Sequence, residues 1–566
     1  MHRPLLFGAL IGALLAGPRL AAAEEDPLLA AMSAEIERAM TELGKTEGDL
    51  APYFIGIEVN ESLGVNIRGE DGALHGWSPT RRRWLDVDVR VGSRTLDSTH
   101  ALRKSRDTMS RFRTTGVSLP WDVDEAVLRH LVWREIEARY AAALERWAKV
   151  QAEARTLVEE DPAEDLTEVE AATSVGSTAT LEFPAAAWED AARSASALLA
   201  ESPAILDGTV NYGGSVHTLW FASSEGTRLR HSESRFRASA QASARADDGD
   251  SIRLFRSWEA DTADGLPARD ELLAHAAELS KEVDAILAAP LQEPYHGPAI
   301  LSDRAAGVFF HEVFGHRVEG HRLKHVDNAQ TFRNRVGEQI LPAFLSVYDD
   351  PTLSEAAGSA LRGHYAFDNQ GVPAQKVVLV DEGVLQGFLQ SRSPVEPTDT
   401  SNGHGRRQIG RAAVSRQGNL QVVASTTTTD AQLRERLLRK VREAGLEYGL
   451  LLDEIAGGFT FTGRTIPNAF NVNVVVAYRV YADGRPDELV RGVDLIGTPL
   501  EAFGNIVAAG ELHRVFNGNC GAESGWVPVS AIAPSLLLES VETQRKRIAQ
   551  DTPPLLPPPT PDGGAS

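Results

Sequence analysis

The chain has 566 residues, of which 42% are apolar and 24% are charged. These proportions are those of a soluble globular protein. The formal net charge of −22 argues against general nucleic-acid binding, which needs a concentrated basic surface. We therefore expect no nucleic acid among the partners.

The first 23 residues have the three parts of a secretory signal peptide. A short basic start at His2 and Arg3 precedes an apolar run over 5–16 and a small-residue cleavage signature that ends at Ala23. The apolar run is too short for a permanent membrane anchor, and no later segment is long and apolar enough to be one. The alternative is an ordinary buried N-terminal helix. We predict a signal peptide over 1–23 and an exported protein, periplasmic or extracellular.

The segment 24–295 mixes helix-like and strand-like patterns and carries no catalytic motif. Apolar residues recur at helical spacing in four stretches, whereas short alternating runs indicate strands. The acidic stretch 159–170 is predicted to be a solvated linker. We expect an N-terminal α/β domain over 24–295. The predicted helices cover 25–50, 122–155, 184–201 and 270–288, and the predicted strands cover 53–59, 62–67, 84–91, 216–221 and 252–258.

A histidine-rich stretch begins the second half of the chain. Ser302 or Asp303 is a plausible helix N-cap, because a short side-chain oxygen accepts one of the free N–H groups there. The apolar residues that follow predict a buried helix, and His311 and Glu312 lie about two turns into it. Imidazoles beside a carboxylate on such a helix indicate a metal site, with the carboxylate as a general base.

The spacing of the motif H-E-x-x-x-H needs a break in that helix. His311 and His316 are five residues apart, which places them roughly 140° apart at about 100° per residue. An undistorted helix would not direct both rings at one ion. Gly315 permits a bulge, a kink or a helix end that brings His316 round. In the alternative, Glu312 and His316 share one helix face, being four residues apart.

The C-terminal half is predicted to be rich in strands. We expect a β-rich domain over 296–550, built on a mostly antiparallel sheet that forms a closed or half-closed barrel against the metal helix, and hence an α+β fold overall. The Pro-rich tail 551–566 is predicted to be disordered. The predicted strands cover 339–348, 374–381, 384–390, 419–424, 470–480 and 489–495, and one helix covers 431–444.

The single cysteine, Cys520, lies in a Gly/Asn-rich turn 209 residues after His311. One cysteine cannot form an intramolecular disulfide, so a lone thiol in an exported protein needs another explanation. One interpretation is a small buried residue without chemistry. The other is a thiolate ligand for a soft metal ion.

Several ordered motifs resemble one family. H-E-V-F-G-H-R-V-E-G (311–320) is similar to the H-E-x-x-x-H motif of the TldD/PmbA metallopeptidases. The resemblance spans most of 296–540 and only weakly the first half. It continues through D-D-P-T-L-S-E-A-A-G-S (349–359), F-D-N-Q-G-V-P-A-Q (367–375), V-L-V-D-E-G-V-L-Q-G-F-L-Q (378–390), S-N-G-H-G-R-R-Q (401–408) and G-N-C-G (518–521).

The resemblance implies a two-domain architecture with an α/β N-terminal domain and a β-rich C-terminal domain. It places Cys520 on the family's third metal ligand. We therefore expect one zinc ion per chain held by His311, His316 and Cys520, and Glu312 as the general base that activates water. This set fits zinc better than magnesium or calcium, which prefer oxygen ligands. The alternatives are a hydrolase with Cys520 as nucleophile and a non-catalytic, metal-stabilised peptide-binding or assembly protein.

The resemblance also implies the partners. Members of the family act on peptides or unfolded segments, and a β-rich site suggests capture of an extended strand. They work with a sister subunit that lacks the metal motif. Because this chain has the motif, we expect a heterodimer with such a sister, or else a homodimer.

Other polar residues near these motifs give weaker predictions. His404, Arg406 and Arg407 lie in a Gly-rich loop and are tentative substrate contacts, the alternative being an exposed basic loop. His321 and His325 form a second metal site or are solvated helix-end residues. The carboxylate of Glu319 is a candidate for orienting a ligand imidazole.

Overall fold

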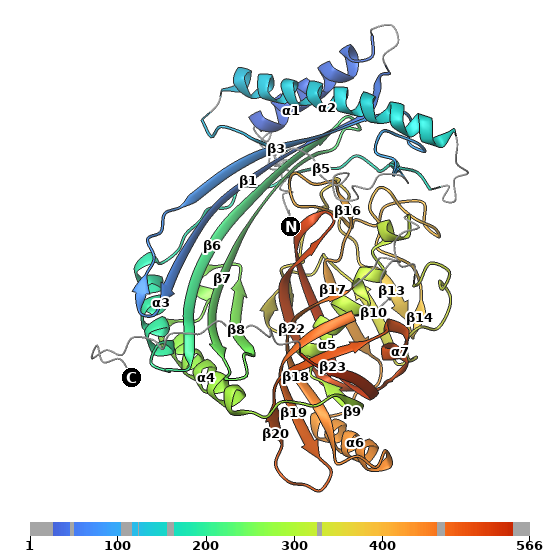
Figure 1. The fold of residues 1–566 in the computed structure, drawn as a ribbon. Helices are drawn as coiled ribbons and strands as arrows, with labels where there is room; N and C mark the ends of the chain where they lie inside the picture. The colour runs from blue at the N-terminus through green and yellow to red at the C-terminus, as the bar shows by residue number, and fades with distance from the viewer. Residues whose placement is uncertain are drawn as a thin grey trace, which may run out of the picture.

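The computed structural model describes residues 26–45, 50–102, 116–122, 124–155, 163–324, 331–460 and 470–546. The predicted signal peptide, the predicted disordered tail and His325 lie outside these residues. Figure 1 shows a long curved sheet from the N-terminal half that arches over the C-terminal half.

The N-terminal half is built on one eight-stranded sheet. Its strands run in the order β4-β3-β1-β6-β7-β5, with β2 beside β1 and β8 beside β7. All neighbours are antiparallel except β5 and β7, which are parallel. Helices α1 and α2 lie at one end of the arch, and α3 and α4 at the other (Figure 1). The main elements are α1 (Pro27–Glu42), β1 (Pro52–Glu70), β3 (Thr80–Val91), α2 (Glu125–Ala154), α3 (Ala185–Leu199), β6 (Ile205–Ser223), β7 (Arg228–Arg245), β8 (Ser251–Ala260) and α4 (Arg269–Ala288), and the short strands are β2 (Ala73–Leu74), β4 (Val117–Ser118) and β5 (Thr173–Val175).

Small side chains set how closely the helices approach this sheet. Every second residue of β7 from Ala238 to Ala244 is a buried alanine in the core that β7 shares with α3 and α4. Because a methyl group occupies little depth, the helices lie close to the strand. Alanine has a low strand propensity, and the sequence analysis accordingly missed β7. It also predicted two strands, 53–59 and 62–67, where β1 is continuous.

The C-terminal half is organised around the long last strand, β23. Pairing runs from β23 through β21, β19, β18 and β9 and returns to β23, so these five strands form a closed circuit. Two pairs, β9–β18 and β17–β23, are parallel, and the other described pairs of this sheet are antiparallel, which agrees with the predicted mostly antiparallel sheet. The circuit strands are β9 (Tyr295–Leu301), β18 (Tyr448–Thr460), β19 (Phe470–Tyr481), β21 (Val493–Gly497) and β23 (Gly525–Arg545).

Further strands extend the C-terminal sheet on both sides of this circuit. The row β17-β10-β13-β14 continues from β23, and β22 pairs with β23. The strands of this sheet are β10 (Leu345–Asp349), β13 (Val377–Asp381), β14 (Val384–Leu385), β17 (Asn419–Ala424) and β22 (Ile506–Ala522), and the short β20 (Glu488–Val490) pairs with β19. Two separate two-stranded sheets are formed by β11 (Glu355–Ala356) with β12 (Ser359–Ala360) and by β15 (Gly405–Arg406) with β16 (Val414–Ser415). The remaining helices of this half are α6 (Asp430–Glu443) and α7 (Pro499–Gly504).

The predicted histidine helix is α5, Asp303–Val313, and it lies in the C-terminal core. Ser302 is its N-cap: the hydroxyl accepts from the N–H of Ala305 at 3.5 Å and donates to the carbonyl of Asp453 on β18 at 2.5 Å. Phe309 and Phe310 are fully buried. The cap and the aromatic packing hold the helix inside the sheet, so the residues at its C-terminal end have fixed positions.

Buried ion pairs join the two halves of the molecule. Arg392 makes a two-pronged contact with the carboxylate of Glu225, at 2.7 and 2.8 Å. Arg407 contacts Glu58 at 3.0 Å and Asp86 at 2.8 Å, both on the N-terminal sheet. Because these charges are shielded from water, the pairs fix how the arch sits on the C-terminal half.

Candidate metal centre

The helix that carries His311 ends just before His316. Helix α5 stops at Val313, and Gly315–Arg317 forms a separate 3-10 turn. The tighter turn changes the direction of the chain, so the imidazole rings of His311 and His316 lie with centroids 5.1 Å apart at an interplanar angle of 71°. The predicted helix end at Gly315 is confirmed.

Gly315 is needed for space and not for an unusual backbone conformation. A Cβ atom at this position would lie 2.0 Å from Oε1 of Gln417. The buried amide of Gln417 donates to the carbonyl oxygen of His311 at 3.3 Å. The absence of a side chain at Gly315 therefore lets Gln417 hold the last turn of α5.

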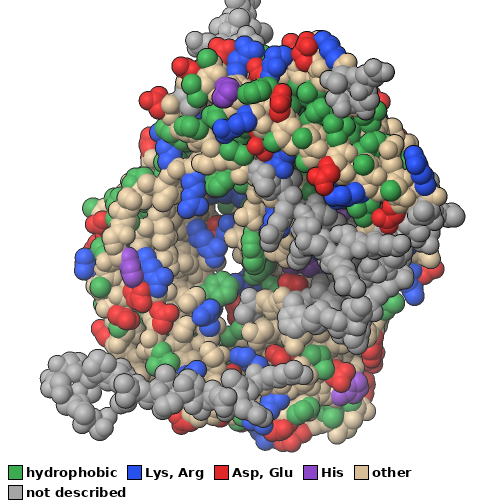
Figure 2. Space-filling model, turned by 45° about the horizontal axis from the view of Figure 1, so that its top comes forward, with side chains coloured by type: hydrophobic (Ala, Val, Ile, Leu, Met, Phe, Trp, Pro, Cys, Tyr) green, Lys and Arg blue, Asp and Glu red, His purple; other side chains and the backbone are tan. Residues whose placement is uncertain are grey.

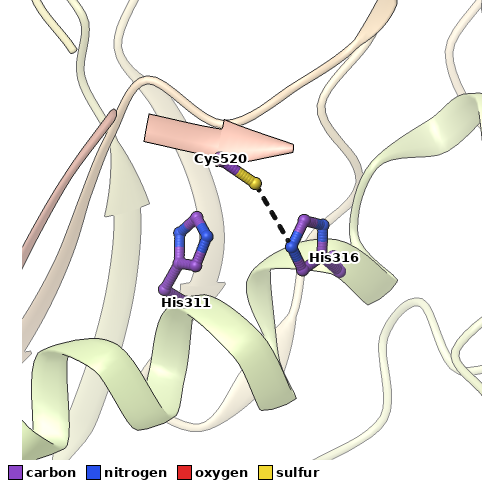
Figure 3. Close-up of side chains that lie close together, drawn as sticks. All are labelled: His311, His316 and Cys520. Carbon is purple, nitrogen blue, oxygen red and sulfur yellow. Dashed lines mark hydrogen bonds between the residues drawn. The ribbon is translucent and has the colours of Figure 1, made fainter. Parts of the chain in front are cut away.

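Strand β22 brings the single cysteine to these histidines. Cys520 Sγ lies 3.3 Å from Nε2 of His316, and the ligand atoms of His311, His316 and Cys520 all lie within 4.8 Å of one another. All three residues are buried, and Figure 3 shows the three side chains converging. The structure thus brings together the three residues predicted as metal ligands.

The donor atoms fit a borderline-soft divalent ion. Two imidazoles and a thiolate form a set that zinc accepts, with a fourth position left for water or substrate. Nδ1 of His311 is buried and has no hydrogen-bond partner among the described residues. A buried polar atom without a hydrogen-bond partner is costly. A cation bound between the three side chains would give this nitrogen a partner.

The cluster is strongly polarised. Burial alone would raise the pKa of Cys520, but His316, His311 and Arg416 lower it well below its ordinary value. Burial alone would lower the pKa of His316, but the Cys520 thiolate and the Glu319 carboxylate raise it to about 10. These interactions favour the thiolate of Cys520, which is the form that binds a metal.

Glu319 orients His316. Its buried Oε2 atom lies 3.0 Å from Nδ1 of His316 and accepts from Nε of Arg322 at 2.9 Å. A carboxylate on one ring nitrogen fixes the tautomer and leaves the other nitrogen for the metal. The predicted contact between Glu319 and a candidate ligand is confirmed.

Arg416 connects the two segments of the site, and the sequence analysis missed it. This fully buried guanidinium donates to Oε1 of Glu319 at 3.2 Å and to the carbonyl oxygen of Cys520 at 2.8 Å. It also contacts the hydroxyl of Ser524 at 2.9 Å and the carbonyl of Gly525 at 3.1 Å. No spacing relates Arg416 to the histidine motif, so only the fold shows this role.

Glu312 lies beside the cluster and is partly exposed. Its Oε2 atom is 3.9 Å from Nε2 of His316. Burial raises its pKa, although His311 and His316 act in the opposite direction. Gly458 of β18 faces it, and a Cβ atom there would lie 3.2 Å from Cγ of Glu312. The carboxylate is thus confined next to the histidines.

His321 is not a solvated helix-end residue, because it is buried. Its Nε2 atom lies 3.5 Å from Oε2 of Glu523, and the other oxygen of Glu523 accepts from Arg322 at 2.6 Å. His321 therefore lies in the polar layer around Glu319, next to the metal cluster. The predicted second metal site with His325 remains a prediction, since His325 lies outside the described residues.

The three tentative substrate contacts have internal partners. His404 is fully buried, with Nε2 at 3.3 Å from Oδ1 of Asp349. Arg406 is buried, donates to the carbonyl of Gln417 and stacks on a tyrosine ring. Arg407 forms the ion pairs with the N-terminal sheet described above. These contacts exclude an exposed basic loop, and the substrate contact of these residues stays a prediction.

The fold and the site define a class of protein: an α+β protein with a buried His/His/Cys cluster beside a glutamate. Residues 294–545 match the model of the PmbA/TldA metallopeptidase C-terminal domain, and residues 161–286 match the model of its central domain. Together these matches cover more than half of the chain. The chain belongs to the PmbA/TldD family of metallopeptidases.

Curated relatives and a solved structure agree with this assignment. A metalloprotease of Archaeoglobus fulgidus is 30% identical over 239 residues, which cover 42% of this chain and 51% of the relative. A zinc metalloprotease TldD homologue of Saccharolobus solfataricus is 22% identical over 249 residues, covering 43% and 51%. The chain thus spans about half the length of these relatives. TldE from Thermococcus kodakarensis has a similar fold, with a TM-score of 0.58 and 14% identity over 91% of this chain and all of that one.

Proposed function

We propose that this protein is a zinc-dependent peptidase that binds one zinc ion per chain. The observation that carries the proposal is the convergence of His311, His316 and Cys520 beside the confined carboxylate of Glu312. The name of the relative from Saccharolobus solfataricus supports zinc, as does the mixed nitrogen and sulfur donor set.

In this proposal the residues of the site act as metal ligands, as positioning residues or as the general base. His311, His316 and Cys520 hold the ion, while Glu319 and Arg416 keep His316 and the β22 strand in register. When bound, zinc supplies Lewis-acid chemistry that acidifies water and polarises a carbonyl group. Glu312 accepts the proton of the attacking water and delivers it to the leaving amine.

The proposed substrates are unfolded or extended peptides. Within the described chain, β22 forms its ladder with β23 on one side only, and a single bridge, Thr428–Gly510, touches the opposite side. An unpaired edge next to Cys520 suits an extended peptide, which would add as a strand through its main-chain groups.

The test compares the wild type with Cys520→Ser and Glu312→Gln. Near-stoichiometric zinc is expected in the wild type and in Glu312→Gln, with most of it lost in Cys520→Ser. Cleavage of a quenched-fluorescence peptide is expected in the wild type alone. If Glu312→Gln cleaves as fast as the wild type, the assigned base is wrong.

Inhibition and peptide-binding measurements separate the two alternatives. A Cys520-dependent hydrolase would be inactivated by an alkylating reagent but not by a chelator. The structure gives it little support, because Sγ is buried between two imidazoles. A non-catalytic peptide-binding protein would bind peptides equally well in the wild type and in Glu312→Gln and cleave none.

For the assembly, we propose pairing with a sister subunit that lacks the metal motif, and a homodimer as the second choice. The fold shared with a TldE protein supports such a pairing. Light scattering of the purified chain, alone and co-expressed with a motif-lacking paralogue, distinguishes these states. No described helix combines the length and apolarity that a membrane crossing requires.

For the localisation, we propose export to the periplasm or the exterior with removal of residues 1–23. Close to the predicted cleavage site, Asp26 caps α1 and accepts from Trp220 at 2.9 Å and from Arg230 at 2.6 Å. Cell fractionation followed by N-terminal sequencing tests this, with Glu24 expected as the first residue. An intact Met1 in the cytosolic fraction would refute it.

A further inference from the structure

Arginine side chains gather around a hollow between the two halves of the protein. Figure 2 shows Lys and Arg side chains on the walls of this hollow, in a molecule whose net charge is −22. Five arginines from the two halves lie close enough to repel one another electrostatically, Arg304 with Arg237 and Arg514, and Arg362 with Arg235 and Arg237. Arg235 and Arg237 lie on β7, Arg304 on α5, Arg362 after β12 and Arg514 on β22. We call these five residues the arginine cluster.

Two buried carboxylates contact three of these arginines. Glu259, directly opposite Arg237 on β8, is 9% exposed and lies 3.3 Å from both Arg237 and Arg362. Asp303 is 2% exposed, whereas its partner Arg514, at 3.2 Å, is 63% exposed. Arg235 instead pairs with the more exposed Glu233 at 2.7 Å, and Arg304 lies 3.6 Å from Glu454, so both buried and exposed acids neutralise part of the cluster.

The cluster has more binding capacity than these carboxylates use. One oxygen of Glu259 serves two guanidiniums. The Nε atoms of Arg304 and Arg362 are buried and have no hydrogen-bond partner among the described residues. Phe255 and Phe516 flank Arg304, with the guanidinium 5.5 and 5.9 Å from their ring centroids. Buried donors without an acceptor favour the arrival of an anion.

The segments that bring the metal residues together also supply this cluster. Arg304 lies on α5 two turns before His311, about 10 Å along the helix axis. Arg514 lies on β22 six residues before Cys520, about 20 Å along the strand. Arg362 contacts the side chain of Asn519, the neighbour of Cys520, at 3.3 Å. An extended peptide with one bond at the metal centre would reach the cluster within about three to six residues.

We propose that the arginine cluster binds carboxylates of the peptide substrate, so that the peptidase prefers acidic residues about three to six positions from the cleaved bond. This inference rests on the proposed function and names its substrate class. A guanidinium pairs with a carboxylate in a two-pronged geometry that a lysine or an amide does not match. The carboxylate comes either from Asp or Glu side chains or from the C-terminus of the peptide.

The test uses the full mature chain loaded with zinc and matched pairs of quenched-fluorescence peptides. In each pair a block of glutamates, on one side of the central bond, is replaced by glutamines, and each peptide is made with a free and with an amidated C-terminus. We expect a KM at least tenfold lower for one glutamate peptide, and a smaller advantage at high ionic strength. An advantage that follows the free C-terminus instead assigns the cluster to the terminal carboxylate.

The variant that removes the site is Arg237→Gln/Arg514→Gln, because both side chains reach solvent. It is expected to abolish the ratio between glutamate and glutamine peptides. The matched control is Arg434→Gln on α6, an exposed arginine paired with Asp487, which should keep the ratio. Equal KM values for the two peptides in the wild type, or a ratio that survives in the double variant, would overturn the proposal.

A binding measurement separates this proposal from the proposed function. Fluorescence anisotropy with a labelled glutamate peptide on Glu312→Gln reports binding without turnover. Arginine-dependent binding by a protein that cleaves nothing would sustain the anion site and refute the peptidase. Cleavage without any preference for acidic peptides would sustain the peptidase and refute the anion site.

Discussion

The guanidinium of Arg416 donates a 2.8 Å hydrogen bond to the main-chain carbonyl of Cys520. The same side chain contacts Glu319, which holds His316. One buried cation thus links the two chain segments that meet at the metal centre, although neither segment is near it in sequence. Its position explains how residues more than 200 apart are kept in register at the scale of a hydrogen bond.

We expect Arg416→Lys to fold and to bind zinc about 10–100-fold more weakly, the usual loss when a group behind a metal ligand is changed. A lysine keeps the charge but cannot reach both segments. Arg416→Ala should also lower the free energy of unfolding by about 3–5 kcal/mol, because Glu319 loses a buried partner. Zinc competition against a chromophoric chelator and thermal unfolding provide the two measurements.

The matched control for Arg416 is Arg392→Lys, a buried arginine in the ion pair between the two halves. It should lower stability and leave zinc affinity unchanged. If Arg416→Lys and Arg392→Lys bind zinc alike, Arg416 has only a structural role.

Glu319→Gln tests the orientation of His316. Glutamine keeps the shape of the side chain but removes the negative charge of the carboxylate, whose Oε2 atom accepts from Nδ1 of His316. We expect zinc affinity to fall about 10–100-fold, with Glu58→Gln, at the domain contact, as a control that spares the metal. Unchanged zinc affinity in Glu319→Gln would mean that the charge of Glu319 is not needed to orient the His316 ring.

Gly315→Ala tests the close approach of Gln417. The new methyl group would overlap the amide of Gln417, so that side chain must leave the carbonyl of His311. We expect weaker zinc binding and a lower unfolding temperature. In the double variant Gly315→Ala/Gln417→Ala the overlap disappears, and part of the zinc affinity should return. A double variant worse than both single variants would show that the glycine acts through the backbone instead.

The ion pair between Glu225 and Arg392, which connects the two halves, predicts how the free energy of unfolding depends on pH. Burial alone would raise the pKa of Glu225, but Arg392 and Arg94 outweigh burial and hold it below its ordinary value of 4.5. Because the folded-state pKa is the lower one, the stabilisation is complete above about pH 4.5 and is lost as pH falls through the folded value.

We therefore expect Glu225→Gln to lower the free energy of unfolding by about 3 kcal/mol at pH 7. The difference from the wild type should shrink steadily below about pH 4. Denaturant unfolding at several pH values measures it, with the more exposed Glu233→Gln as control. A difference that stays constant down to pH 3 would contradict the assigned charge interaction.

The sequence predicted the helices well because their apolar spacing and caps are local. The predicted helix 184–201 is α3 at Ala185–Leu199, and 431–444 is α6 at Asp430–Glu443. Strands were predicted less completely. The buried face of β7 consists largely of alanines, which give no strand-like apolar alternation. The long hairpin β22–β23 was not predicted either, because its stability comes from pairing with β9, β17 and β21 across the sheet.

For the candidate site, the residues with distinctive chemistry could be found in the sequence, and those with ordinary chemistry could not. His311, His316 and Cys520 are rare residue types in motifs that resemble a family, and the structure brings them together. The sequence placed Arg406 and Arg407 either at the substrate or in an exposed basic loop, whereas in the structure their charged and polar partners come from other segments. A charge that is neutralised by a distant segment has the same local sequence as one that is free.

The closed circuit of strands also determines when the metal centre can form. Helix α5 follows β9 directly, and Cys520 lies on β22, just before β23, the strand that closes the circuit onto β9. A ribosome makes the chain from its N-terminus, so the histidines exist long before the cysteine that completes their set. A growing chain therefore has no complete His/His/Cys set until its last hairpin is made.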